Sequence, residues 1–170
     1  MNKYGAKPFF LGKETGSRTV TRQNSTDEFF ASEYEYEVYQ ELLRWIPQEM
    51  IERQYKIMIK PKTFRYPAMY WTADFAILDP RINLDGTFRK PLAVIEAKGF
   101  VTNDFKVRIK LLEYVQPILY SRLIIVKPGE SNQSIDSSAL RTDNLKTLRQ
   151  SIDRLVPIGC TFIANSKKEK

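Results

Sequence analysis

Two acidic residues and a lysine interrupt apolar, strand-like runs near the middle of the chain. Asp74 lies in "YWTADFAIL", and Glu96 and Lys98 lie in "PLAVIEAKGF". Because successive side chains of a strand point to opposite faces, Glu96 and Lys98 share one face. If the two runs pair as a hairpin, Asp74 approaches Glu96 across the ladder. Two carboxylates and an ammonium would then gather at one strand end.

A divalent cation is one way to neutralise such a group. Burying ionised groups without partners is costly, so the arrangement needs compensation. Asp74, Glu96 and the Ala97 carbonyl are hard oxygen ligands that suit Mg²⁺, for which Mn²⁺ can substitute. Lys98 would orient an attacking water, help it lose a proton, or offset charge on a phosphate. The alternative is a salt bridge from Lys98 to Asp74 or Glu96 without chemistry, and spacing does not choose between the two.

A third carboxylate is expected from a helix. Glu35 precedes Val38, Tyr39 and Leu42 at helical spacing, which puts it on the core-facing stripe. An inward glutamate can add a ligand to the same cation. The alternative is that Glu35 lies at the edge of the stripe and reaches water.

Composition excludes several other chemistries. The 170 residues contain no histidine, which rules out Ser-His and Cys-His nucleophilic sites and histidine-bound metals. The single cysteine, Cys160, cannot form an internal disulfide, and no secretory signal or membrane span is recognisable, so we expect a cytoplasmic protein. A net charge of +7 favours polyanions such as nucleic acid as partners.

The spacing of apolar residues and the positions of cap and turn residues predict an α/β fold in the order helix, three strands, helix, strand, helix, strand. The first helix is expected over 26–46, with Ser25 and Glu28 as its capping box, and the second begins at Asn103 or Asp104. Strands are expected at "MIERQYKIMIK", "MYWTADFAIL", "PLAVIEAKG", "SRLIIVK" and "GCTFIAN". The second and third helices are expected at "NDFKVRIKLLEYV" and "NLKTLRQSIDRLV". We divide the chain into a basic arm at 1–24, one domain at 25–165 and a charged tail at 166–170.

The chain resembles the PD-(D/E)xK nuclease superfamily. "TADF" and "VIEAKG", whose acids Asp74 and Glu96 lie 22 positions apart, follow the Asp then Glu-x-Lys pattern, with Ala73 in place of the usual proline. "NKYGAK", "SEYE", "WTADF", "IEAKG" and "LIIVK" occur in the order of phage-type endonuclease I, the Holliday-junction resolvase family. The resemblance extends over residues 2 to 127, as short matching segments separated by dissimilar sequence. It implies a restriction-endonuclease-like αβββαβ core with a mixed central sheet flanked by helices.

The resemblance also implies a function and a site. Glu35, Asp74, Glu96 and Lys98 would be the catalytic set of a Mg²⁺-dependent DNA endonuclease in phage recombination, acting as a homodimer on branched or four-way-junction DNA. Thr102, Lys106 and Lys110 would contact DNA beside the scissile bond, although a charged helix face can also be merely solvated. A glutamine near the metal occurs in some members, but we interpret Gln54 as an ordinary strand residue. The alternatives are a restriction or transposition nuclease, or a non-catalytic DNA-binding module that retains the fold.

Overall fold

The structure is a computed structural model that describes residues 7–80, 90–99, 101–129 and 141–155, of which 141–143 are described by their backbone alone. The expected strand at 159–165 and the tail at 166–170 lie outside the described residues. None of the described helices is long and apolar enough to cross a membrane.

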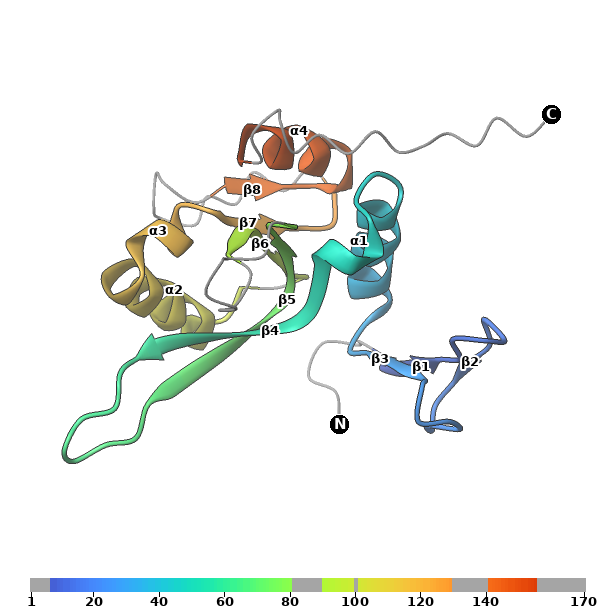
Figure 1. Cartoon of the computed structure of the whole chain (residues 1–170), viewed down its shortest axis with the longest axis horizontal. Helices are drawn as coiled ribbons and strands as arrows, with labels where there is room; N and C mark the ends of the chain where they lie inside the picture. The colour runs from blue at the N-terminus through green and yellow to red at the C-terminus, as the bar shows by residue number, and fades with distance from the viewer. Residues whose placement is uncertain (1–6, 81–89, 100, 130–140, 156–170) are drawn as a thin grey trace.

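A mixed sheet of five strands forms the centre of the fold (Figure 1). Its order is β4 (Ile51–Lys60), β5 (Met69–Leu78), β6 (Pro91–Ala97), β7 (Leu123–Val126) and β8 (Arg141–Asp143). The first three strands pair antiparallel, whereas β6, β7 and β8 run parallel. The predicted α/β class with a mixed sheet is confirmed, and four of the five strands lie where the sequence predicts them.

Helices cover both faces of this sheet. On one side α1 (Glu33–Leu43) and α4 (Leu145–Leu155) bury Val38, Leu42 and Leu148. On the other, α2 (Asn103–Val115) and the short α3 (Pro117–Tyr120) bury residues that include Ile109 and Tyr120. The two resulting cores share the sheet, with Ile124 facing one and Ile125 the other. This alternation explains why β7 reads as a continuous apolar run.

The first helix begins seven residues later than expected. Its N-cap is Ser32, whose Oγ accepts a hydrogen bond from the Glu35 N–H at 3.1 Å, and it ends at Leu43. Residues 28–30 instead form strand β3 (Glu28–Phe30). The prediction of a cap at Ser25 was therefore wrong, because "STDE" and "SEYE" carry the same capping signal and only pairing of Phe29 and Phe30 distinguishes them. Similarly, α2 is capped by Thr102 rather than by Asn103 or Asp104.

The expected basic arm contains folded structure. β1 (Phe9–Leu11) pairs with both β2 (Arg18–Thr19) and β3 in a small second sheet. Phe9 stacks on Phe30 with 5.5 Å between ring centroids, and both rings are buried in the core beneath α1. The boundary predicted at residue 24 thus cuts through a sheet, since β1 and β2 precede it and β3 follows it. A short 3-10 turn, η1 (Gln48–Met50), leads into β4.

Candidate active site

Asp74 and Glu96 meet where β5 and β6 pair. The register places Phe75 opposite Ile95, which puts Asp74 next to Glu96 on the neighbouring strand. The Ala97 N–H donates to Asp74 Oδ2 at 2.8 Å, and the Asp74 N–H reaches Glu96 Oε2 at 3.4 Å. These reciprocal contacts hold each carboxylate against the backbone of the other strand.

Asp74 also marks a change of environment along β5. Trp71 and Ala73 belong to the core under α2, whereas Phe75 and Ile77 belong to the core under α1. The carboxylate therefore lies at the junction of the two cores. A polar side chain at such a junction is enclosed by apolar neighbours on the strand before and after it.

Lys98 forms an ion pair with Glu96. Its Nζ lies 2.5 Å from Glu96 Oε1 and 4.8 Å from the centroid of the Phe105 ring on α2. Glu96 is almost completely buried, while the side chain of Lys98 is partly exposed. The salt bridge considered from the sequence is thus formed, and it joins Lys98 to Glu96 rather than to Asp74.

Glu35 is buried, which rules out the alternative that it reaches water at the edge of the helical stripe. Its exposed fraction is 2%, its Oε2 accepts from the Ala31 N–H at 2.9 Å, and its Oε1 lies 3.2 Å from Gln54 Nε2. Arg53 Nη2 lies 3.7 Å from the same Oε1. Part of the Glu35 carboxylate therefore caps the start of α1, and part faces β4.

The electrostatics show that the three carboxylates influence one another. Burial first, then the charges of Glu96 and Glu35, raise the pKa of Asp74 well above its ordinary value. Burial also raises the pKa of Glu96, against the favourable charge of Lys98, and the pKa of Glu35, against its hydrogen bond from Ala31. Lys98 and Arg53 supply two positive charges against three negative ones. Because Arg53 also pairs with Glu28, the four acids and two cations together keep two excess negative charges when all are ionised.

The donor set suits a hard cation, but it is small. Carboxylate oxygens of Asp74 and Glu96 are the ligand type that Mg²⁺ takes, usually together with several waters. Among the described residues, no three acidic, cysteine or histidine side chains are grouped closely enough to hold a metal ion by themselves. A cation here would depend on Asp74 and Glu96, with remaining positions filled by backbone oxygen, such as the Ala97 carbonyl, and water.

Gln54, which the sequence interpretation set aside, lies in the site. It falls between Arg53 and Tyr55, which pair with Phe75 and Ala73, so it sits opposite Asp74. Its φ of 54° is the only positive value at a non-glycine residue in the described part of the chain. Such strained backbone often occurs at functional positions. No sequence pattern predicts the positive φ of Gln54. Its place in the site could have been inferred only from its polar side chain on the strand next to the one that carries Asp74.

The expected DNA contacts lie on α2. The Thr102 Oγ1 accepts from the Phe105 N–H at 3.1 Å as the helix cap, which leaves its own O–H as a donor. Lys106 and Lys110 are exposed on the solvent side of α2, and Arg108 pairs with Asp104. Their exposure is compatible with phosphate contacts and equally with solvation.

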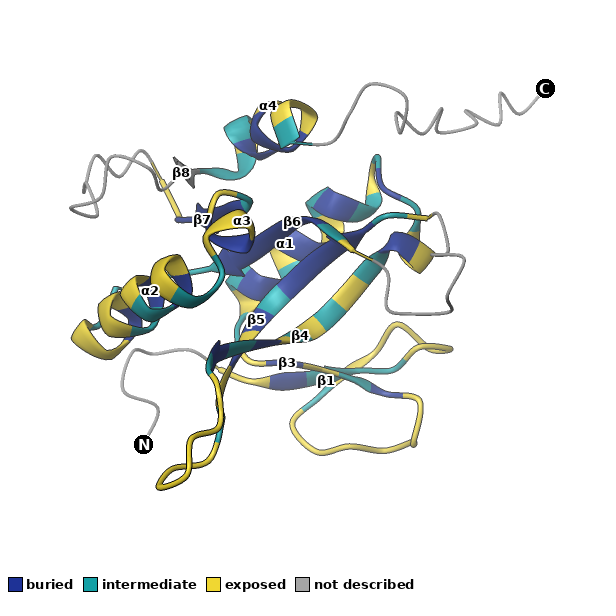
Figure 2. Cartoon of the chain, turned by 60° about the vertical axis from the view of Figure 1, so that its left-hand side comes forward, coloured by how far each residue is buried: buried dark blue, intermediate teal, exposed yellow. Residues whose placement is uncertain are grey.

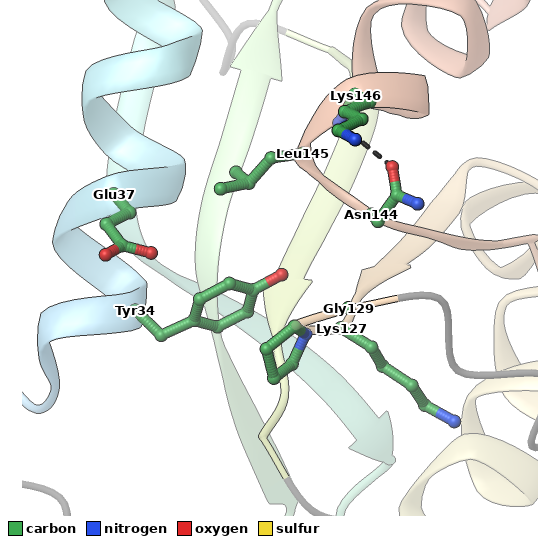
Figure 3. Close-up of a pocket in the computed structure, with 8 residues that line it drawn as sticks. Tyr34, Glu37, Lys127, Gly129, Asn144, Leu145 and Lys146 are labelled. Carbon is green, nitrogen blue, oxygen red and sulfur yellow. Dashed lines mark hydrogen bonds between the residues drawn. The ribbon is translucent and has the colours of Figure 1, made fainter.

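A cavity of about 260 Å³ opens beside this site, between the start of α1 and the start of α4 (Figure 3). Tyr34 points into it, and Leu145 and Lys146 approach from α4. The Tyr34 hydroxyl is buried without a hydrogen-bond partner among the described residues, and burial raises the pKa of Tyr34. None of the four predicted catalytic side chains lines the cavity, so the carboxylate group and the cavity are separate features.

Comparisons of the chain with protein-family models, with curated proteins and with solved structures found no match. The geometry of the described residues therefore carries the functional argument.

Proposed function

We propose that the chain is a metal-dependent DNA endonuclease with a restriction-endonuclease-like core of the PD-(D/E)xK type. The observation that carries the proposal is the meeting of Asp74, Glu96 and Lys98 at paired strand positions, with the pKa values of both carboxyls raised. An acidic pair of which Glu96 is buried and Asp74 is partly buried is costly unless it serves a charged ligand. Glu35, selected from three neighbouring glutamates by its helical position, adds its charge to the same group.

The roles follow from the geometry. Asp74 and Glu96 would hold Mg²⁺ or Mn²⁺, with Ala97 and Glu35 contributing directly or through water. The bound cation supplies Lewis-acid stabilisation of the charge that develops on a phosphate. Lys98 reaches the same point from the exposed side, where its ammonium can hold the attacking water or a phosphate oxygen. A divalent cation would neutralise the excess negative charge of the group, so that the site would no longer repel a phosphodiester.

The wider surface fits a DNA substrate. The net charge of +7 and the exposed Lys106 and Lys110 favour backbone contacts that do not depend on base sequence. We further propose a branched substrate such as a four-way junction. Two symmetrical cuts need two sites, so the active form would be a homodimer working in the cytoplasm, of a phage host if phage-encoded.

One observation favours the alternative of a non-catalytic DNA-binding module. The ion pair between Lys98 and Glu96 already neutralises one carboxylate of the site. In a module without chemistry this pair would be permanent. In the nuclease, the Glu96 carboxylate would hold the cation, and Lys98 would contact the substrate instead of Glu96.

Cleavage separates the two functions. Purified protein is incubated with a labelled four-way junction and a linear duplex of matched sequence, in Mg²⁺ or in EDTA. We expect symmetrical nicks in the junction that disappear in EDTA and fall at least about a hundredfold in Asp74→Asn and Lys98→Ala. Asp153→Asn, which changes an exposed aspartate on α4, is the matched control and should cut like the wild type.

Binding without product in both Mg²⁺ and Mn²⁺ would exclude the nuclease on these substrates and favour the binding module. Cleavage that survives Asp74→Asn would mean that the chemistry lies elsewhere in the chain.

A further inference from the structure

The hairpin of β4 and β5 extends beyond the body of the molecule. Figure 1 shows the two strands leaving the sheet together and ending in a loop far from α1 and α4. In Figure 2 the loop is exposed along its whole length. Its tip, 61–67, is exposed at every residue.

The outer part of the hairpin carries positive charge only. Between Glu52 and Asp74 the chain has five cationic residues and no acid; the cations are Arg53, Lys56, Lys60, Lys62 and Arg65. Arg53 is engaged with Glu28 and Glu35 at the base, so the other four give the outer part its charge. A protruding element whose four cations form no ion pair with an acid among the described residues is complementary to a polyanion.

Large apolar side chains lie exposed among these cations. Phe64 is completely exposed, Tyr66 is 61% exposed and Tyr70 is 52% exposed. Apolar surface gathered at a protruding tip generally marks a binding site. Lys56 Nζ lies 4.5 Å from the Tyr70 ring centroid and Lys60 Nζ lies 4.7 Å from that of Tyr66, so charge and ring are interleaved.

Hydrogen bonds within the tip stabilise its turn. The Thr63 N–H donates to the Tyr66 carbonyl at 2.9 Å, and the Tyr66 N–H donates to Thr63 Oγ1 at 3.1 Å. This closes a four-residue turn with Phe64 and Arg65 at its centre. Pro61 and Pro67 flank the turn and restrict the backbone on both sides. A preformed tip loses less conformational entropy on binding.

The hairpin face leads towards the candidate active site. Tyr70 and Asp74 are four residues apart on β5, so they lie on the same face and about 13 Å apart along the strand. Lys56, opposite Thr72, lies on that face too. A rise of about 3.4 Å per base pair makes this distance about four base pairs of DNA. A duplex cut at Asp74 would therefore reach the hairpin several base pairs away.

We propose that this hairpin is a nucleic-acid-binding arm that recognises DNA with unstacked bases. Lys56, Lys60, Lys62 and Arg65 contact phosphates, and Phe64 and Tyr66 stack on bases that are free at a branch point. Aromatic rings stack on any base, whereas a continuous duplex leaves no base face free at its side. The inference deepens the proposed function, because it rests on DNA as the substrate and gives the preference for branched DNA a structural origin.

The test measures binding in EDTA, where cleavage plays no part. Fluorescence anisotropy compares a four-way junction, a duplex with a single-stranded gap and a continuous duplex, for the wild type and Phe64→Ala/Tyr66→Ala. We expect affinity for the junction and the gapped duplex to fall at least about tenfold, and affinity for the continuous duplex to change less than about threefold. Phe29→Ala is the control, because Phe29 is a 46% exposed aromatic on β3, outside the hairpin.

A second variant tests the charges. Lys62→Ala/Arg65→Ala should weaken binding to all three DNAs alike and lower the slope of log affinity against log salt by about 1.8. Both variants change exposed side chains, so we expect their thermal unfolding temperatures to match that of the wild type. This measurement verifies that each variant is folded. Equal affinity of wild type and Phe64→Ala/Tyr66→Ala for every DNA would overturn the proposal, as would equal losses on gapped and continuous duplex.

The outcomes separate this proposal from the proposed function. Binding that depends on Phe64 and Tyr66, in a protein that cuts nothing in Mg²⁺, would support the arm and contradict the nuclease. Cleavage and binding that do not depend on these rings would be consistent with the proposed nuclease function and would contradict the proposed role of the hairpin as a binding arm. Binding to vesicles of phosphatidylglycerol and phosphatidylcholine that needs Phe64, while DNA binding does not, would assign the tip to a membrane surface instead.

Discussion

At the scale of residues, Gln54 shows how the site is held. Its left-handed backbone turns its amide to Glu35 at a position opposite Asp74. An L-residue pays roughly 1–2 kcal/mol for this conformation, which glycine adopts freely. The strained backbone therefore belongs to the residue that connects β4 to the Glu35 carboxylate.

We predict that Gln54→Gly is more stable than Gln54→Ala by about 1 kcal/mol. Both variants lose the amide contact with Glu35, so the difference isolates the backbone. Urea unfolding of the two proteins gives the free energies of unfolding. Equal stabilities, or a more stable alanine variant, would mean that the strain is absent.

The main site residues could be predicted from the sequence because strand alternation and helical spacing are local rules. They selected Glu96 with Lys98, which form an ion pair, and Glu35 from its neighbours, whose charge helps to raise the pKa of Asp74. The choice of Lys98 partner could not be predicted, since it depends on side-chain rotamers. Arg53 and Gln54 were missed because their positions depend on the register of β4 against β5 and on an unusual φ.

At the scale of elements, the start of α1 decides where Glu35 points. The Ser32 Oγ satisfies the Glu35 N–H, so cap and candidate ligand belong to the same turn. A helix that began at Ser25 would carry Glu35 in its interior and would remove β3, one of the two strands that pair with β1.

We predict that Ser32→Ala lowers the free energy of unfolding by about 1 kcal/mol, because one N–H at the helix start loses its partner. Ser25→Ala is the matched control, and since Ser25 is exposed and precedes β3, it should change stability by less than about 0.5 kcal/mol. Chemical denaturation measures both. A larger loss for Ser25→Ala would restore the earlier helix start.

Element types were more predictable than their ends. Long periodic segments gave β4, β5, α2 and α4 almost to the residue. The short strands β1, β2, β3 and β8 were not expected, because two or three residues carry no readable period and form a strand only when a partner strand is present. The two competing capping signals near α1 show the same dependence on tertiary pairing.

At the scale of the whole molecule, the small sheet is part of the domain. Phe30 is fully buried and stacks on Phe9, and its ring centroid lies 3.8 Å from the guanidinium carbon of Arg53. Arg53 in turn reaches Glu28 and Glu35. The segment before α1 is thereby tied to the strand that carries Gln54.

We predict that Phe30→Ala costs about 3–5 kcal/mol of stability, because a large buried ring leaves a cavity. The neighbouring Phe29 is 46% exposed, so Phe29→Ala should cost clearly less. Thermal and urea unfolding provide the comparison. Similar small losses in both variants would mean that residues 7–30 are not integrated into the core.

The proposed function requires the pair of Asp74 and Glu96 to be a cation site. Calorimetric titration of Mn²⁺ into the metal-free protein tests it most directly, in wild type, Asp74→Asn, Glu96→Gln and the control Asp153→Asn. We predict saturable binding in wild type and in Asp153→Asn, and at least about tenfold weaker binding in the other two variants, since each removes a charged ligand. No saturable binding in the wild type, or equal affinity in Asp74→Asn, would contradict the account and leave the ion pair of Lys98 and Glu96 as a purely structural feature.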